Sequence, residues 1–155
     1  MDVQIRTANG NDADNITRLL MELGWFSRFH ADEYNARLEE VHRGILECLA
    51  DDSHSLFVAE GDEGQFVGYA SVHWLPYMFL RGREGYLSEL FVSEVSRGQG
   101  IGKVLLDTVT EEARRRGCSR LSLITSRHRA SYQRGFYKKQ GWVEREAVAN
   151  LVYEL

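Results

Sequence analysis

The sequence predicts an α/β protein whose central sheet is mixed and mostly antiparallel. Strand-like runs of alternating or β-branched residues recur near both ends and in the middle of the chain. Segments with helical spacing of apolar residues lie between these runs. The parallel contribution should come from the strand–helix–strand unit that spans residues 86–125. We therefore expect about seven strands flanked by about four helices.

The first fifty residues predict one strand and two helices. Residues 3–8 alternate apolar and polar side chains, as a short strand does. Asn11 or Asp12 can cap the helix that follows, and Gly24 ends it. The apolar face of this helix consists of Ile16, Leu19, Leu20 and Leu23. A second helix is expected from about Asp32 to Ala50.

The middle of the chain predicts three strands. SLFVAEG (55–61) and QFVGYASVHWL (65–75) lie on either side of the turn residues GDEG, which is typical of a hairpin. GYLSELFV (85–92) is rich in the residues that favour strands. These three segments should form the centre of the sheet.

The last part of the chain predicts two helices and three strands. A helix is expected at 102–116, because its apolar residues share one face, and a strand at 119–125. A further helix near 131–140 is followed by two closing strands, at about 142–146 and 150–154.

Length and composition describe an ordinary globular protein. The 155 residues are 43% hydrophobic and 27% charged, which suits one domain over residues 1–155. The net charge of −4 argues against nucleic-acid binding, because phosphate affinity depends on clustered cations. The run Arg114–Arg116 is a local exception, and a solvated helix end with cations near the negative pole of the dipole explains it.

Neither a membrane span nor a metal site is expected. The first residues contain no apolar leader, and the apolar run 74–80 is short and interrupted by Pro76. Cys48 and Cys118 have no disulfide or metal-ligand spacing, and the histidines form no ligand cluster. We expect a cytoplasmic protein with reduced thiols.

A glycine-rich stretch, RGQGIGK (97–103), opens the helix that follows the strand ending at Val92. The first N–H groups of a helix have no partner within it and attract anions. Glycine lets a phosphate approach the backbone without meeting a Cβ atom. Arg97 and Lys103 add positive charge, so the expected ligand is a phosphate or pyrophosphate.

Spacing excludes two better-known phosphate loops. The P-loop needs a Ser or Thr after its Gly-Lys pair, whereas Gly102 and Lys103 are followed by Val104. The dinucleotide fingerprint needs G-x-G-x-x-G, whereas the glycines here are spaced G-x-G-x-G.

Two motifs match a known family instead. Arg97, Gly100 and Gly102 fit R-x-x-G-x-G directly after LSELFV, and FYKKQGW (136–142) fits F-Y-x-x-x-G-[FW]. With these motifs and its order of elements, the sequence resembles the GNAT superfamily of acetyltransferases. The resemblance implies the GNAT acyl-CoA N-acyltransferase fold over a single domain, with acetyl-CoA as co-substrate and no metal.

The resemblance also implies where coenzyme A binds. The stretch 97–103 would wrap the pyrophosphate. The strand through Leu90–Val92 would bulge and splay from the strand at 119–125, so that pantetheine pairs with exposed backbone. Ser131 stands, weakly, where the family often has an Asn. The implied contact residues are Leu90, Phe91, Val92, Arg97, Gly98, Gln99, Gly100, Ile101, Gly102, Lys103, Ser131 and Tyr137.

Acetyl transfer from a thioester to an amine makes three chemical demands. The amine, with a free pKa near ~10, must lose a proton. The oxyanion needs hydrogen-bond donors, for which backbone N–H groups around Leu90–Val92 are candidates. The leaving thiolate needs a proton donor. The resemblance implies Tyr137 for this donor, and its alternative role is packing beside Tyr132 and Phe136.

Glu89 is the candidate base, acting directly or through water. Its alternative roles are a solvent-facing carboxylate or a ligand for the substrate cation. His73 and Tyr86 could border the acceptor pocket, or simply pack within the strands.

The sequence therefore predicts an enzyme that moves an acetyl group from acetyl-CoA to a primary amine by direct attack on the thioester. The aromatic segments WFSRFH (25–30) and WLPYMF (74–79) favour a small-molecule amine over a protein tail. A protein N-terminal or lysine acetyltransferase and a non-catalytic acyl-CoA-binding regulatory module remain as alternatives. A homodimer formed through the C-terminal strand also stays open.

Overall fold

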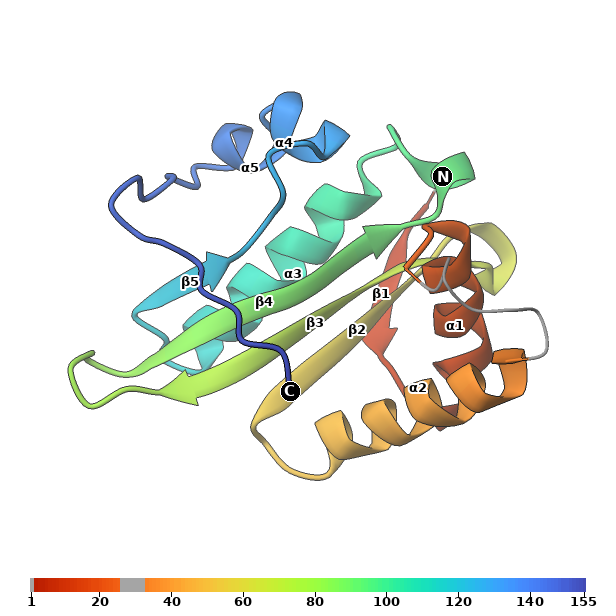
Figure 1. Ribbon diagram of the computed structural model, residues 1–155. Helices are drawn as coiled ribbons and strands as arrows, with labels where there is room; N and C mark the ends of the chain where they lie inside the picture. The colour runs from red at the N-terminus through yellow and green to blue at the C-terminus, as the bar shows by residue number, and fades with distance from the viewer. Residues whose placement is uncertain (1, 26–32) are drawn as a thin grey trace. The chain divides into compact units, whose positions relative to one another are not determined.

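The computed structural model describes residues 2–25 and 33–155 of the chain (Figure 1). The chain divides into two compact units, residues 1–124 and 125–155. The strands are β1 (Gln4–Thr7), β2 (His54–Glu60), β3 (Phe66–Pro76), β4 (Arg83–Val92) and β5 (Arg120–Leu123). The α-helices are α1 (Ala13–Glu22), α2 (Tyr34–Leu49), α3 (Ile101–Arg115), α4 (Ala130–Gln133) and α5 (Phe136–Lys139). The predicted start of the second helix, Asp32, lies outside the described residues.

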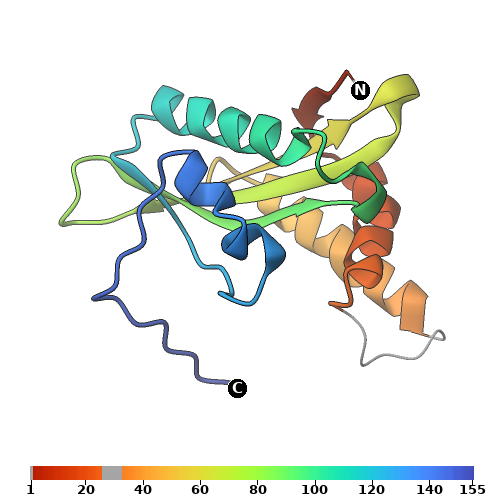
Figure 2. The same cartoon turned by 90° about the horizontal axis from the view of Figure 1, so that it is seen from above.

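The five strands form one sheet in the order β1-β2-β3-β4-β5. All neighbours are antiparallel except β4 and β5, which are parallel and joined through α3. The mixed, mostly antiparallel α/β architecture is therefore confirmed, as is the single parallel crossover. In the larger unit, α3 lies on one face of the sheet and α1 and α2 lie on the other (Figure 2).

Each face of the sheet buries its own set of apolar side chains. Because side chains alternate along a strand, the two sets interleave in the sequence of β3. The set beneath α1 and α2 contains Ala8, Ala13, Ile16, Leu19, Leu20, Ile45, Leu56, Val58 and Tyr69. The apolar side of α3 is likewise buried, through Ile101, Leu105, Leu106, Val109 and Ala113.

Asp12, one of the two residues predicted to cap α1, occupies its N-cap position, but the Asp12 side chain makes no capping hydrogen bond to the helix. A short 3₁₀ turn, Gly10–Asp12, precedes the helix, and the Asn9 side chain caps that turn. The buried Asp12 carboxylate accepts hydrogen bonds from the Asn9 amide at 2.8 Å and from two nitrogens of Arg6 at 2.7 and 2.8 Å. Burial alone would raise the pKa of Asp12, but these donors outweigh it and the pKa is lowered.

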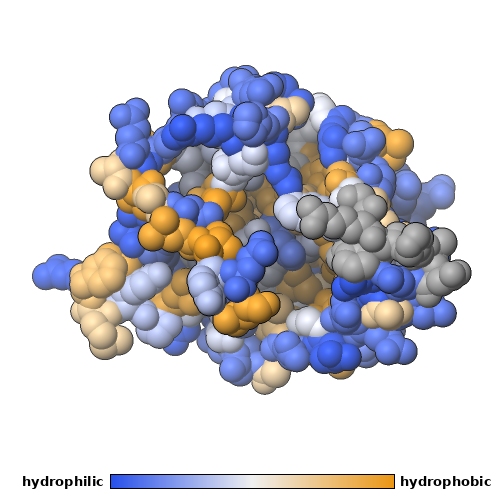
Figure 3. All heavy atoms as spheres, viewed as in Figure 1, coloured by the Kyte–Doolittle hydropathy of each residue, from blue (hydrophilic) through white to orange (hydrophobic). Residues whose placement is uncertain are grey.

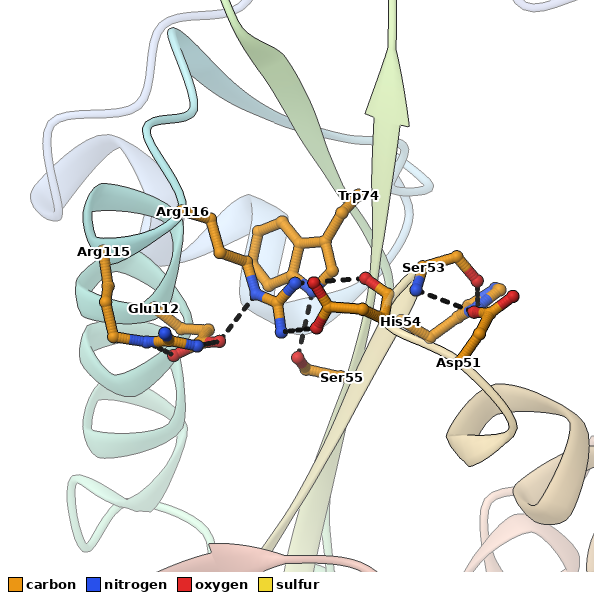
Figure 4. Close-up of polar contacts among 9 residues, drawn as sticks. Asp51, Ser53, His54, Ser55, Trp74, Glu112, Arg115 and Arg116 are labelled. Carbon is orange, nitrogen blue, oxygen red and sulfur yellow. Dashed lines mark hydrogen bonds and ion pairs between the residues drawn. The ribbon is translucent and has the colours of Figure 1, made fainter.

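The arginine run at the end of α3 is paired with acidic side chains. Arg114 contacts Glu111, and Arg115 contacts Glu112. Arg116 contacts Glu112 at 2.6 Å and Asp52 at 2.7 Å, and its guanidinium lies 4.9 Å from the centroid of a Trp74 ring (Figure 4). Arg116 thus ties the turn before β2 to the last turn of α3.

Arg116→Ala should lower the free energy of unfolding by about 1–3 kcal/mol, because it removes two ion pairs and the packing over buried Trp74. The matched control is Arg114→Ala, whose exposed pair with Glu111 contributes little. Chemical denaturation of both variants beside the parent measures the difference. Equal midpoints for all three proteins would contradict this role.

The smaller unit differs from the prediction at two places. The helix expected near 131–140 is two short helices, because Gly135 between them adopts a left-handed φ of +66°. The two strands expected at 142–146 and 150–154 are absent, so the described sheet has five strands rather than seven. Apolar alternation is present there, but a strand forms only where another strand pairs with its backbone. Side chains such as Leu151 and Tyr153 are exposed instead.

Candidate active site

The glycine-rich loop connects β4 to α3 through a 3₁₀ turn at Glu94–Ser96. Gly98 and Gly100 adopt φ values of +79° and +84°, which L side chains rarely adopt, so glycine is required by the backbone itself. A Cβ atom added to either glycine would meet no protein atom within 4 Å. The space in front of both residues is therefore free for a ligand.

Five successive backbone amides of this loop, 98–102, donate to no protein acceptor within the described residues. The helical ladder begins only at the amides of Lys103 and Val104, which both donate to the Gly100 carbonyl. Unpartnered amides at the start of a helix suit an anion with several oxygens. This geometry fits the pyrophosphate predicted from the sequence.

The cations of the loop are held by neighbouring acids. Arg97 pairs with Glu94 at 3.2 Å, and Lys103 pairs with Asp107 one turn further along α3. Both pairs are exposed, and exposed ion pairs are weak enough to open for a phosphate. Gln99 donates through its side chain to the Val95 carbonyl at 3.4 Å.

Gly100→Ala should weaken acetyl-CoA binding by at least about tenfold, because its methyl group occupies the free space before the amides. The left-handed φ also means that any side chain strains the fold, and a β-branched residue such as Val most of all. Gly117→Ala, at the other end of α3, is the matched control, since its φ of +68° and open surroundings impose the same strain. Equal affinities for the two variants, measured by calorimetry, would remove the loop from the coenzyme A site.

Strand β4 loses its parallel neighbour halfway along its length. Strand β5 pairs with Glu84–Leu87 only, in register with Arg120–Leu123. Buried Glu84 fixes this end, because it accepts a hydrogen bond from Arg120 at 2.8 Å and another from Ser122. Beyond Leu87, no strand of the described larger unit pairs with that edge of β4. An extended pantetheine arm could pair there in place of a strand.

The bulge in β4 lies earlier than predicted. Ser71 faces Glu89 and Val72 faces Leu87, so Ser88 is the extra residue between them. Leu90–Val92, where the bulge was expected, pair in regular register with β3. The Ser88 hydroxyl explains the shift, because it donates to the Ser71 carbonyl at 3.2 Å.

The carboxyl group of Glu89 faces α1 and α2. Glu89 pairs with Ser71, and two residues further along Phe91 pairs with Tyr69. Tyr69 belongs to the apolar set beneath α1 and α2, so Glu89 lies on the same face. Burial raises the pKa of Glu89, so its carboxylate is a stronger base than an exposed one. A base poised nearer neutral pH is suited to deprotonating an ammonium group.

Two groups beside Glu89 were not singled out from the sequence. Burial and the neighbouring Glu89 charge raise the pKa of the Tyr69 hydroxyl, which has no hydrogen bond of normal geometry within the described residues. Burial together with Glu89 and Glu47 also raises the pKa of the Cys48 thiol. These groups come close to Glu89 through strand pairing and helix packing. A sequence motif does not report either of these, so no signal in the sequence pointed to the two groups.

The other predicted acceptor residues separate onto two faces. His73 and Tyr86 lie opposite each other on β3 and β4, with ring centroids 5.9 Å apart, on the face that carries Glu89. Trp74 is buried on the opposite face, where it donates to Ser55 at 3.0 Å (Figure 4), so it cannot line the acceptor side. Met78 and Phe79, in the β3–β4 connection, are exposed. This connection lies at the left of Figure 1, and hydrophobic colour appears at the same side of Figure 3. Most of the segment 25–30 lies outside the described residues.

The second motif, residues 136–142, contains α5 and the capping turn that ends it. Gly141 has a φ of +84°, and the Trp142 amide donates back to the Tyr137 carbonyl at 3.1 Å, as in a Schellman motif. The rings of Phe136 and Trp142 approach Tyr137 edge to face, at 4.9 and 6.0 Å. Burial raises the pKa of Tyr137, so its hydroxyl stays protonated at neutral pH. Ser131 lies half-buried in α4.

Comparison with known families decides the identity of this arrangement. The model of the acetyltransferase (GNAT) family matches residues 19–142, which include both motifs. The chain belongs to the GNAT family. It is an acetyl-CoA-dependent N-acetyltransferase, as its family and several characterised relatives show.

Two curated proteins are similar in sequence to this GNAT protein over most of its length. A thialysine N-epsilon-acetyltransferase from Bos taurus is 30% identical over 78% of this chain and 73% of its own length. An aminoglycoside N(6')-acetyltransferase type 1 from Serratia marcescens is 34% identical over 70% of this chain and 77% of its own. Among solved structures, a transcriptional regulator from Bacillus halodurans C-125 covers 99% of this chain and all of its own, with 27% identity and a TM-score of 0.84.

Two further observations concern the part of the GNAT chain that the structure describes. None of its helices combines the length and the apolar composition needed to cross a bilayer. No three His, Cys, Asp or Glu side chains among residues 2–25 and 33–155 come together as a metal site would require.

Proposed function

We propose that this enzyme acetylates a primary amine of a small molecule, with Glu89 as base and Tyr137 as proton donor. One observation carries the proposal: a half-buried carboxyl with a raised pKa stands on β4 just past the point where β5 ends. The same strand leads into the loop 97–103, with its five unpartnered amides. Base and coenzyme site thus share one continuous segment. We also propose that residues 1–155 act as a single catalytic domain.

Each proposed residue has one task in the reaction. Acetyl-CoA supplies an acyl group activated as a thioester. Glu89 takes a proton from the substrate ammonium, directly or through water, and the freed nitrogen lone pair attacks the thioester carbon. A C–N bond forms and the C–S bond breaks. The Tyr137 hydroxyl protonates the departing sulfur. The nitrogen loses its second proton to solvent as the amide forms, and the tyrosine regains a proton from solvent.

The binding site for the coenzyme A pyrophosphate comprises the loop 97–103. The amides of Gly98–Gly102 would donate to the phosphate oxygens, and Arg97 and Lys103 would exchange their acidic partners for the ligand. Leu90–Val92 would accompany the pantetheine arm, and their backbone amides would stabilise the oxyanion. Ser131 is assigned to the same arm through its position before the second motif.

Three considerations favour a small polar amine as acceptor. On the face of the sheet that carries Glu89, His73 and Tyr86 add groups able to form hydrogen bonds. The carboxylate can attract a cationic amine before it accepts the proton. The two curated relatives named above act, by their names, on thialysine and on an aminoglycoside, which are small amines.

A panel of amines tests the proposal. The enzyme is mixed with acetyl-CoA and with single acceptors: amino acids with a side-chain amine, aminoglycosides, polyamines, and peptides with free N-termini or lysines. Release of free coenzyme A thiol is followed, with Gly100→Ala as the binding-deficient control. We expect turnover with at least one small amine and much less with Gly100→Ala. Turnover with peptides alone would favour a protein acetyltransferase instead, and no turnover with any small amine would contradict the proposed substrate class.

A further inference from the structure

Strand β4 loses support on both edges at the same residue, Ser88. On one edge, pairing with β5 ends at Leu87. On the other edge, the ladder with β3 is interrupted, because Ser88 is the extra residue of the bulge. A bulged residue leaves ladder hydrogen bonds unmade and allows the strand to bend. Glu89 follows directly and is the first residue to pair with β3 again, opposite Ser71, so the place of the proposed base depends on the geometry of the bulge.

Two side-chain hydrogen bonds cross the bulge and replace the missing support. The Ser88 hydroxyl donates to the Ser71 carbonyl at 3.2 Å, and its oxygen lies 2.8 Å from Nε2 of His73. Since the serine proton is directed to Ser71, the serine oxygen acts as acceptor and His73 carries its proton on Nε2. Ser88 is thereby held from both sides of the register shift.

His73 is itself fixed by its surroundings. Its ring packs against His54 with centroids 4.4 Å apart and against Tyr86 at 5.9 Å. Nδ1 of His54 lies 2.6 Å from the Ser53 hydroxyl, in the turn before β2 (Figure 4 shows Ser53 and His54). Burial and the neighbouring His54 lower the pKa of His73, so the neutral ring persists at neutral pH. The donor on Nε2 is therefore held in one orientation.

We propose that His73, acting through Ser88, is a positioning residue that sets the bulge of β4 and with it the place of the Glu89 carboxyl. Catalytic groups must be held to within about 0.5 Å. Just before Glu89, at Ser88, neither neighbouring strand pairs in register, so side-chain contacts must fix the bulge. The inference rests on the proposed function only for the role of Glu89. The clamp itself, His73–Ser88–Ser71, is a property of the fold.

Four variants and a control test the clamp. Ser88→Ala removes the hydroxyl, and His73→Phe keeps a ring of similar size without a donor. His73→Gln retains an N–H donor, and the double variant joins Ser88→Ala to His73→Phe. The control is His128→Gln, an exposed residue. Thermal unfolding first establishes that each protein is folded.

We expect Ser88→Ala and His73→Phe each to lower kcat by about tenfold, with KM for acetyl-CoA changed by less than about twofold. The double variant should be no slower than either single one, because both break the same unit. His73→Gln should recover most of the rate. Unchanged kcat in both single variants, or effects that multiply in the double variant, would overturn the clamp.

Amide hydrogen exchange provides a readout that needs no acceptor. In Ser88→Ala, the amides of Glu89 and Leu90 should exchange at least about fivefold faster than in the parent, while amides of β2 stay unchanged. Equal exchange in the two proteins would overturn the clamp even if catalysis were impaired. If no amine is acetylated by the parent, the proposed function fails, and exchange still decides whether His73 and Ser88 hold the bulge.

Discussion

Tyr137→Phe is expected to lower turnover by about ten- to a thousandfold, with little change in acetyl-CoA affinity. The range follows from the usual contribution of a general acid and from water acting as a poorer substitute. Steady-state kinetics with a saturating amine measure the loss, and calorimetry measures the affinity. Because the ring remains, its edge contacts with Phe136 and Trp142 should keep the helix end intact.

Tyr153→Phe is the matched control, since it removes an exposed hydroxyl from the same unit. It should leave both turnover and affinity at the parent values. If Tyr137→Phe also turned over at the parent rate, in a step shown to be limited by chemistry, Tyr137 would be a packing residue only.

Glu89→Gln is expected to lower turnover by about a hundredfold or more near neutral pH, because the amide cannot accept a proton. Burial raises the pKa of Glu89, so the parent rate should climb with pH as the carboxylate form becomes populated. The pH–rate profile of Glu89→Gln should lack this rise. At high pH the free amine becomes abundant, and the deficit should shrink.

The same substitution should affect stability in the opposite direction: Glu89→Gln is expected to lower activity but to raise stability at neutral pH. A carboxyl whose pKa is raised by folding binds more protons in the native state than in the unfolded state, so its burial costs stability as pH rises through the raised pKa. Gln carries no charge to bury. Glu89→Gln should therefore unfold at a higher temperature than the parent at pH 7, and at a similar temperature at pH 4.

The alternative role of Glu89 gives a different pattern. If its carboxylate only holds the substrate cation, Gln should raise KM for the amine and leave the maximal rate nearly unchanged. Parallel pH–rate profiles for the two proteins would remove Glu89 from the catalytic residues.

The geometry of the glycine-rich loop was predictable because it depends on local sequence. The glycines of 97–103, the cations on either side and the helix that follows are adjacent in sequence, so spacing alone selected an anion and excluded other phosphate loops. The left-handed φ angles of Gly98 and Gly100 agree with that reasoning. The crossover from β4 to β5 was predictable for the same reason, since its strands and helix follow one another directly.

Features that depend on pairing between distant segments were not predictable. Whether Ser88 or Leu90 bulges is decided by the register with β3, where Ser71 and His73 offer partners to a small hydroxyl side chain. The C-terminal segment has the alternation of a strand, yet within the described residues no strand pairs with it. Local composition states what a segment can form, and pairing decides what it does form.

Cys48 suggests an alternative mechanism, in which the enzyme itself is acetylated before the amine. Its thiol lies close enough to Glu89 for the carboxylate charge to affect it, and a cysteine there could take the acetyl group before the amine does. Burial and that negative charge raise the pKa of Cys48, which keeps the thiol protonated and a poor nucleophile. Direct attack by the amine is therefore favoured over an acetylated enzyme.

Initial velocities over a grid of acetyl-CoA and amine concentrations test the central claim most directly. The best amine of the panel is used, and the coenzyme A thiol released is recorded for the parent and for Cys48→Ser. Direct transfer within one complex predicts double-reciprocal lines that intersect, with the same pattern and a similar rate in the variant. Parallel lines in the parent, lost together with activity in Cys48→Ser, would contradict direct attack.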